Sequence, residues 1–199
     1  MQNTLFKFAK NRKLFMNASR LKVQKGRPKV LFVDDDNRIH KYTTHISKTL
    51  RLHKRTAFDP VQAKRIINLR LRAIERLKAR LWVKKELAKT KEERAELIKR
   101  ILALNKLKKN PFALIVSDVN MPRGNPTGIN FVQEVRRKLP QQKILMHSDD
   151  INSLDYLMEK GFEREIKETD LSGKKLKERI KSELWPAKYP RKRTPEDWS

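Results

Sequence analysis

The sequence predicts an α/β fold built on a doubly wound, five-stranded parallel sheet with helices on both faces. Short apolar runs such as Val30–Val33 break abruptly into acidic residues, which is typical of strands buried on both faces of a parallel sheet. Amphipathic segments of helical length alternate with these runs, as βαβ units require. No apolar stretch approaches the roughly 18 residues that span a bilayer, and cysteine is absent. We therefore expect neither an integral membrane protein nor thiol chemistry.

The charge of the chain points to a polyanionic partner. Lys and Arg number 49 against 23 Asp and Glu, which gives a formal net charge of +26. Residues 1–33 contain no acidic side chain, and residues 1–28 are interpreted as a basic N-terminal arm that is disordered until it meets a polyanion. An organellar transit peptide is the alternative interpretation. The expected location is the cytoplasm, with an organelle matrix as the alternative.

The first elements follow from local patterns. Val30–Val33 is the first expected strand, and a helix follows with Ile39, Thr43, Ile46 and Leu50 at helical spacing. The segment "HKRTAFDP", residues 53–60, is a weaker second strand that ends at Asp59.

A helical hairpin is expected over about residues 60–108. Asp59, Pro60 and Gln62 form a helix start, and the apolar stripe that follows extends to about Ala88. A capping box of Thr90 and Glu93 begins a second helix. Acidic residues are too few here to pair with the cations, so we expect this segment to bind a polyanion. The predicted contacts are Arg65, Arg70, Arg72, Arg76, Lys78, Arg80, Lys84, Lys85, Lys108 and Lys109.

Strands and helices alternate through the rest of the chain. Expected strands are residues 112–118, 143–149 and, more weakly, 164–168. Helices are expected after each of them, within residues 129–139, 151–161 and 172–184. Residues 185–199 form a Pro-rich, extended C-terminal tail.

Polar residues at the strand ends predict a site. In an open parallel sheet, ligands bind outside the carboxyl ends of the strands. That edge would collect Asp34, Asp35, Asp118, Ser148 and Lys167. Three carboxylates close together need a counter-charge, and Mg²⁺ supplies one to oxygen ligands. The expected ligands are Asp34, Asp35, Asp118 and the backbone carbonyl of Asn120.

The motifs "VLFVDDD", "IVSDVNMP" with "GINFVQEVR", and "ILMHSD" resemble the receiver domain of bacterial response regulators, a flavodoxin-like fold. The resemblance spans residues 29–184 if residues 62–108 are an insertion. It implies that Asp118 accepts phosphate from a histidine kinase or phosphotransfer protein. It also implies that Asp34 and Asp35 hold Mg²⁺, that Ser148 is the switch hydroxyl, and that Lys167 contacts the phosphoryl group.

Departures from the family pattern leave an alternative function open. The loop after Pro122 is long, acidic residues follow Ser148, and Glu168 stands where the family has proline. The alternative is a phosphorylation-inactive pseudo-receiver that serves as a structural nucleic-acid-binding or ribonucleoprotein component. An aspartyl phosphatase ranks last, because Asn120 stands where that class has a second aspartate, so an enzyme is not expected. For the polyanion, RNA or DNA ranks above an acidic protein or a membrane surface.

Overall fold

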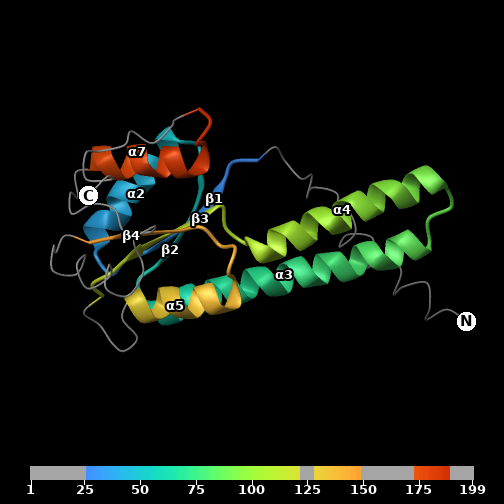
Figure 1. Ribbon diagram of the computed structural model, residues 1–199, viewed down its shortest axis with the longest axis horizontal. Coiled ribbons are helices and arrows are strands. Elements are labelled where there is room, and N and C mark those ends of the chain that lie inside the picture. Colours follow the sequence, from blue (N-terminus) through green and yellow to red (C-terminus); the bar gives the residue numbers. More distant parts are fainter. Residues whose placement is uncertain (1–25, 122–127, 149–172, 189–199) are drawn as a thin grey trace, which may run out of the picture.

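The computed structural model describes residues 26–121, 128–148 and 173–188. Four parallel strands form the sheet in this part of the chain. They are β1 (Lys29–Val33), β2 (His53–Ala57), β3 (Leu114–Asp118) and β4 (Ile144–His147), in the order β2-β1-β3-β4 (Figure 1). The expected fifth strand at residues 164–168 and the expected helix at 151–161 lie outside the described residues. So do residues 1–25 of the basic arm and most of the tail.

Helices cover both faces of the sheet. Alternate residues of β1 separate the two cores, because Leu31 and Val33 point to one face and Val30 and Phe32 to the other. The first face is covered by α3 (Pro60–Glu86) and α5 (Gly128–Lys138). The second is covered by α2 (Asn37–Thr49) and α7 (Gly173–Leu184) (Figure 1). The expected doubly wound, receiver-like architecture is confirmed.

The two helix starts predicted at Asp59 and Thr90 are present in the structure. Asp59 accepts a hydrogen bond from the backbone N–H of Gln62, whose side chain in turn accepts from the N–H of Phe58. Thr90 caps the next helix by accepting from the N–H of Glu93. These side chains satisfy amides that would otherwise lack partners at a helix N-terminus.

The helices α3 and α4 (Lys91–Lys109) form the expected hairpin, which extends well beyond the sheet (Figure 1). Ile74, Ile101 and Leu104 are buried within it. Ala63 and Ile67, however, belong to the core cluster under the sheet. The first turns of α3 therefore pack in the core under the sheet, and the same continuous helix forms the first arm of the hairpin.

None of the described helices combines the length and the apolar content that crossing a bilayer requires.

Candidate phosphoacceptor site and basic hairpin

The carboxylate cluster lies where the strand order reverses. β1 and β3 are hydrogen-bonded neighbours although one strand and three helices separate them in sequence. Asp118 ends β3, and Asp34 and Asp35 directly follow β1, so all three residues meet at the carboxyl edge. One carboxylate oxygen of each lies within 4.8 Å of the others. This is the topological switch point at which ligands bind in such sheets.

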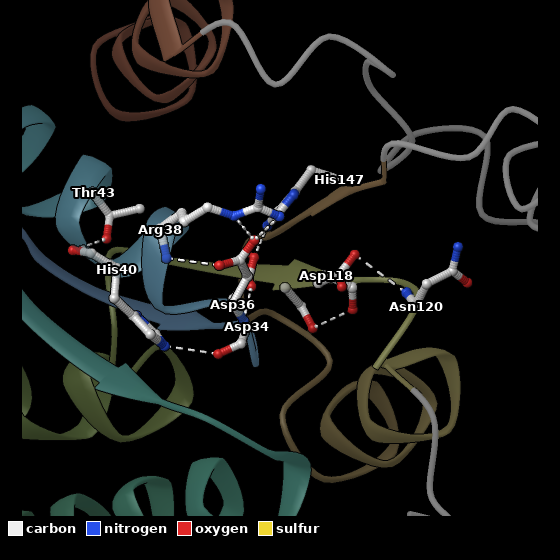
Figure 2. A network of polar contacts seen from close by, with 9 residues as sticks. Asp34, Asp36, Arg38, His40, Thr43, Asp118, Asn120 and His147 are labelled. Carbon is white, nitrogen blue, oxygen red and sulfur yellow. Dashed lines mark hydrogen bonds and ion pairs between the residues drawn. The ribbon is translucent and has the colours of Figure 1, made fainter. Parts of the chain in front are cut away.

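Asp34 is the buried member of the cluster and is held by contacts to both of its oxygens (Figure 2). Oδ1 accepts a 2.8 Å hydrogen bond from the backbone N–H of Asp36. Oδ2 lies 3.3 Å from Nε2 of His147, whose side chain is equally buried. The backbone of Asp34 is tied as well, since its N–H donates to the carbonyl of Ala57 at 3.0 Å. These contacts fix the orientation of the Asp34 carboxylate.

A second histidine, His40 of α2, contacts the backbone of Asp34 just after β1. Its Nε2 lies 2.7 Å from the carbonyl oxygen of Asp34, and because a carbonyl only accepts, Nε2 carries the proton. Burial lowers the pKa of His40, and the hydrogen bond to Asp34 opposes that shift. The ring also packs edge-on against Phe58, with centroids 4.3 Å apart. His40 is thus a neutral donor that positions the turn after β1.

Asn120 joins Asp118 to the end of β4. Its backbone N–H lies 3.2 Å from Oδ1 of Asp118 (Figure 2). Its side-chain amide donates to the hydroxyl of Ser148 at 3.2 Å. Ser148 is fully buried directly after β4. The structure therefore brings Asp34, Asp35, Asp118 and Ser148 to one edge, as predicted. Lys167 lies outside the described residues.

Gly128 explains how α5 begins beside Asp118. A Cβ atom at this position would lie 2.0 Å from the backbone oxygen of Asp118 and 3.0 Å from the side chain of Met121. No side chain fits in that space, so only glycine allows the helix to start against the end of β3. Gly128 therefore has a structural role, which is to let α5 begin in contact with the backbone of Asp118.

The donor set fits a hard divalent cation. Three carboxylates within 4.8 Å of one another repel unless a positive charge lies among them. All of their ligand atoms are oxygens, which Mg²⁺ prefers. Asp35 and Asp118 are partly exposed, so an ion could reach them from solvent. The backbone carbonyl of Asn120 would be a fourth oxygen ligand from the loop after β3.

Sequence reasoning missed His147 as a member of this site. Its contact with Asp34 depends on the order of the strands in the sheet. β4 pairs with β3 so that His147 lies beside Asp118, and this pairing brings His147 close to Asp34. The available signal was its position at the end of an apolar run, beside Ser148. A histidine there is a hydrogen-bond donor and, when protonated, a cation.

The basic hairpin is the second candidate site. Residues 60–109 carry 17 Lys and Arg against 5 Glu, with no Asp. Several of the predicted contact residues are exposed: Arg65, Arg72, Arg76, Arg80, Lys84, Lys108 and Lys109. Lys78 is half-buried. Repulsion among so many cations favours binding of an anion.

Arg70, Lys85 and Lys108, three of the predicted contact residues, have partners that the structure identifies. Arg70 lies over the ring of Phe112, 5.3 Å from its centroid, and donates to the carbonyl of Pro111. Burial is the main cause that lowers its pKa. Lys85 lies over the Trp82 ring and pairs with its neighbour Glu86. Lys108 pairs with Glu75 of the other helix at 2.6 Å. Of these, Arg70 is the one that anchors the base of the hairpin to the body.

Comparisons with known proteins found likenesses among solved structures. No family model and no curated protein matches the chain. The BeF3-activated receiver domain of DrrB is 16% identical, with 79% of this chain and 97% of that chain covered and a TM-score of 0.44. The signal receiver domain of a Luxo repressor protein from Vibrio parahaemolyticus is 17% identical, with 81% and 93% covered and a TM-score of 0.47. The bacteriophytochrome response regulator RtBRR is 14% identical, with 84% and 99% covered and a TM-score of 0.42.

The fold of this chain is receiver-like. The order β2-β1-β3-β4, all parallel, is the order of the first four strands in flavodoxin-like receiver folds.

Proposed function

We propose that the chain is a receiver-like phosphoacceptor in which Asp118 takes up a phosphoryl group with the help of Mg²⁺. The observation that supports this most directly is the convergence of Asp34, Asp35 and Asp118 within 4.8 Å at the switch point of the sheet. The donor would be a histidine kinase or a phosphotransfer protein. Mg²⁺, held by the three carboxylates and the Asn120 carbonyl, would supply positive charge to the phosphoryl oxygens.

The residues of the chain have separate tasks in this reaction. A carboxylate oxygen of Asp118 attacks the phosphorus of a phosphohistidine and the P–N bond breaks. The donor imidazole keeps that electron pair and takes up a proton from water, and an acyl phosphate remains on Asp118. The N–H of Asn120, 3.2 Å from Oδ1, orients the nucleophilic carboxylate. The hydroxyl of Ser148, which accepts from the side chain of Asn120, would donate to a phosphoryl oxygen.

Phosphorylation with a small-molecule donor tests the proposal. Wild-type protein incubated with acetyl phosphate and Mg²⁺ should gain the mass of one phosphoryl group, and chelation of Mg²⁺ should prevent the gain. Asp118→Asn should not react. Asp36→Asn is the matched control, because Asp36 caps α2 and pairs with Arg38 rather than joining the cluster. A phosphorylated Asp118→Asn variant would show that another residue is the acceptor.

A pseudo-receiver is the second candidate, and the contact between His147 and Asp34 favours it. A protonated imidazole 3.3 Å from Oδ2 would supply the counter-charge that the cluster otherwise takes from a metal ion. In that case the cluster is a structural element of a nucleic-acid-binding scaffold. Unfolding with and without Mg²⁺ separates the two functions, because a ligand that binds the native state raises its stability. Absence of both a Mg²⁺ effect and phosphorylation would favour the pseudo-receiver.

Under either function, we propose that the hairpin binds the phosphate backbone of nucleic acid. The exposed arginines of α3 recur on one side of the helix at spacings of four and seven residues, which suits an extended polyanion. Affinity should be dominated by phosphate contacts and should fall with salt.

Charge substitution is a cleaner test of the hairpin than deletion. Removal of residues 62–108 would also remove Ala63 and Ile67 from the core. The test variant changes four exposed arginines of α3 to glutamine: Arg65, Arg72, Arg76 and Arg80. The control changes four exposed cations elsewhere: Lys41, Lys48, Arg137 and Lys174. The test variant should flatten the dependence of log affinity on log salt by about 3 for duplex DNA or RNA, and the control by less than about 1. Equal slopes for the two variants would refute a specific role of the hairpin.

A further inference from the structure

A hollow at the base of the hairpin gathers cations from three helices. It has a volume of about 720 Å³ and is bounded by α3, α4 and the end of α5. Its lining residues are Lys78, Asn105, Lys108, Lys109, Lys138, Leu139, Pro140 and Gln141. Four of the eight are lysines and none is acidic. The lysine of α5 is about 30 residues away from those of α4 in the chain, so only the fold brings this set together.

The carboxylates next to the hollow do not balance its charge. Glu75 pairs with Lys108 at 2.6 Å, and Glu134 pairs with Lys138 at 2.7 Å. Among the described residues, no carboxylate lies at ion-pair distance from Lys78 or Lys109. Glu75 acts on Lys78 only at longer range, so the four lysines carry more positive charge than the two glutamates offset. An anion in the hollow would offset that excess.

Stabilisation of helix ends explains only part of the cluster. Lys108, Lys109 and Lys138 stand in the last turns of α4 and α5, where cations offset the helix dipole. Lys78 lies eight residues before the end of the 27-residue helix α3, outside its last turn. The helix dipole therefore does not explain why this half-buried residue lines the hollow. Lys78 is the residue that distinguishes a binding site from helix capping.

We propose that this hollow, with Lys78 and Lys109 as its principal cations and Lys138 as its contribution from α5, binds a phosphodiester group of the nucleic-acid backbone. The proposal rests on the proposed function of the hairpin and adds to it a contact on the side of α3 away from the exposed arginines. Lysines contribute point charges to phosphate, and the amide groups of Asn105 and Gln141 can donate hydrogen bonds to its oxygens. Leu139 and Pro140 give the hollow an apolar part that can pack against a sugar or a base.

The position of the hollow also places the bound strand relative to Asp118. α5 begins at Gly128, against the backbone of Asp118, and ends at the hollow with Lys138. Its middle is tied to α3 by Glu134, which lies 2.9 Å from Lys64. The carboxylate cluster and the hollow therefore lie at opposite ends of one helix, and the phosphodiester would bind on the hairpin side of it.

The test compares two double variants with the same change of charge on the hairpin. Lys78→Gln with Lys109→Gln removes the unpaired cations of the hollow. Lys89→Gln with Lys99→Gln removes two exposed cations outside it. Binding of a short duplex and of a single strand is measured over a range of salt for the full chain. We expect the hollow variant to bind about 10-fold more weakly and its salt slope to fall by about 1 to 2, while the control changes less than about 3-fold. Lys78→Gln alone should already account for a measurable part of the loss.

The outcomes are distinguishable. If the wild type binds neither nucleic acid, the proposed function of the hairpin fails and the proposal falls with it. If the wild type binds but the two double variants lose affinity equally, only the hollow is refuted. Thermal unfolding of the variants separates a folding defect from a binding defect, and the single Lys78→Gln variant provides the comparison if the double variant unfolds. In a final experiment, inorganic phosphate is titrated into the protein and its binding is monitored by NMR. Signal shifts at Asn105 and Gln141 without any loss of nucleic-acid binding in the hollow variant would show a small-anion site and overturn the phosphodiester assignment.

Discussion

Nε2 of His147 lies 3.3 Å from Oδ2 of Asp34, and both side chains are buried at the carboxyl edge of the sheet. This contact ties the ends of β1 and β4 together across β3, which separates them in the sheet. A buried carboxylate is costly unless its oxygens have hydrogen-bond donors. Oδ1 of Asp34 accepts from the backbone N–H of Asp36, and Oδ2 faces Nε2 of His147. The histidine thus faces one oxygen of the same carboxylate that a metal ion in the cluster would use.

Replacement of this histidine should destabilise the fold most when metal is absent. His147→Leu leaves Oδ2 of Asp34 without its imidazole partner, and we expect a loss of about 1–3 kcal/mol in the free energy of unfolding in the presence of a chelator. Mg²⁺ should restore part of that loss, because it offers the carboxylate a new partner. Urea unfolding with chelator and with Mg²⁺ measures both values. His45→Leu, at an exposed position of α2, is the control and should be nearly neutral. An equal loss under both conditions would show that His147 and Mg²⁺ do not act on the same carboxylate, and a wild type that Mg²⁺ does not stabilise would show that the cluster binds none.

The close approach of Gly128 to Asp118 predicts a strong effect of a single methyl group. Gly128→Ala would place a Cβ atom 2.0 Å from a backbone oxygen, so either α5 or the end of β3 must move. We expect a loss of about 1–3 kcal/mol in stability and a reduced rate of Asp118 phosphorylation. Gln133→Ala, at an exposed position of the same helix, should be neutral or slightly stabilising because alanine favours helices. Wild-type stability and rate in Gly128→Ala would contradict the geometry.

The fold and most of the cluster could be predicted because each depends on local patterns. The strand that ends at Asp118 and the acids after β1 are visible as apolar runs followed by carboxylates, and parallel strands place such ends at one edge. His147 was not predictable as a site residue in the same way. Its role depends on the register of β4 against β3, and because every residue of β4 is buried, the hydrophobic pattern does not distinguish one register from another.

The basic hairpin shows the other limit of prediction from sequence. The capping residues Asp59 and Thr90 gave its helix starts correctly, because caps act within a few residues. Which cations face solvent depends on contacts that are distant in sequence. Arg70 contacts Pro111 and Phe112, and Lys138 reaches the hollow from α5. Counting the charges along α3 and α4 predicts neither the contacts of Arg70 nor the position of Lys138.

Arg70 should therefore matter for stability rather than for binding. Arg70→Lys would lose the planar group over the Phe112 ring and the directed hydrogen bond to Pro111, and we expect a loss of about 1–2 kcal/mol. Arg72→Lys, at an exposed position two residues along, preserves the charge and should be neutral. Both variants should keep the nucleic-acid affinity and salt slope of the folded wild type. A weaker affinity in Arg70→Lys without loss of stability would show that its guanidinium contacts the ligand instead.

The ion pairs of Glu134 predict how stability depends on pH. Hydrogen bonds from Lys138 and then from Lys64 lower the pKa of Glu134 from 4.5 to about 2 in the folded chain. A carboxylate with a lowered folded pKa binds fewer protons than in the unfolded chain, so its stabilisation is complete above pH 4.5. That stabilisation declines as the pH falls towards 2. Glu134→Gln should cost about 0.5–1 kcal/mol at pH 7, a value limited by solvent screening of these partly exposed groups.

Urea unfolding of wild type and Glu134→Gln between pH 7 and pH 3 checks this expectation. The difference between the two should shrink steadily below pH 4.5. Glu96→Gln is the control, because Glu96 and Arg100 form an exposed pair within α4 and should contribute little at any pH. A difference that stays constant over the whole range would mean that Glu134 acts through its shape and neutral hydrogen bonds. In that case, its charge would not hold α5 against α3.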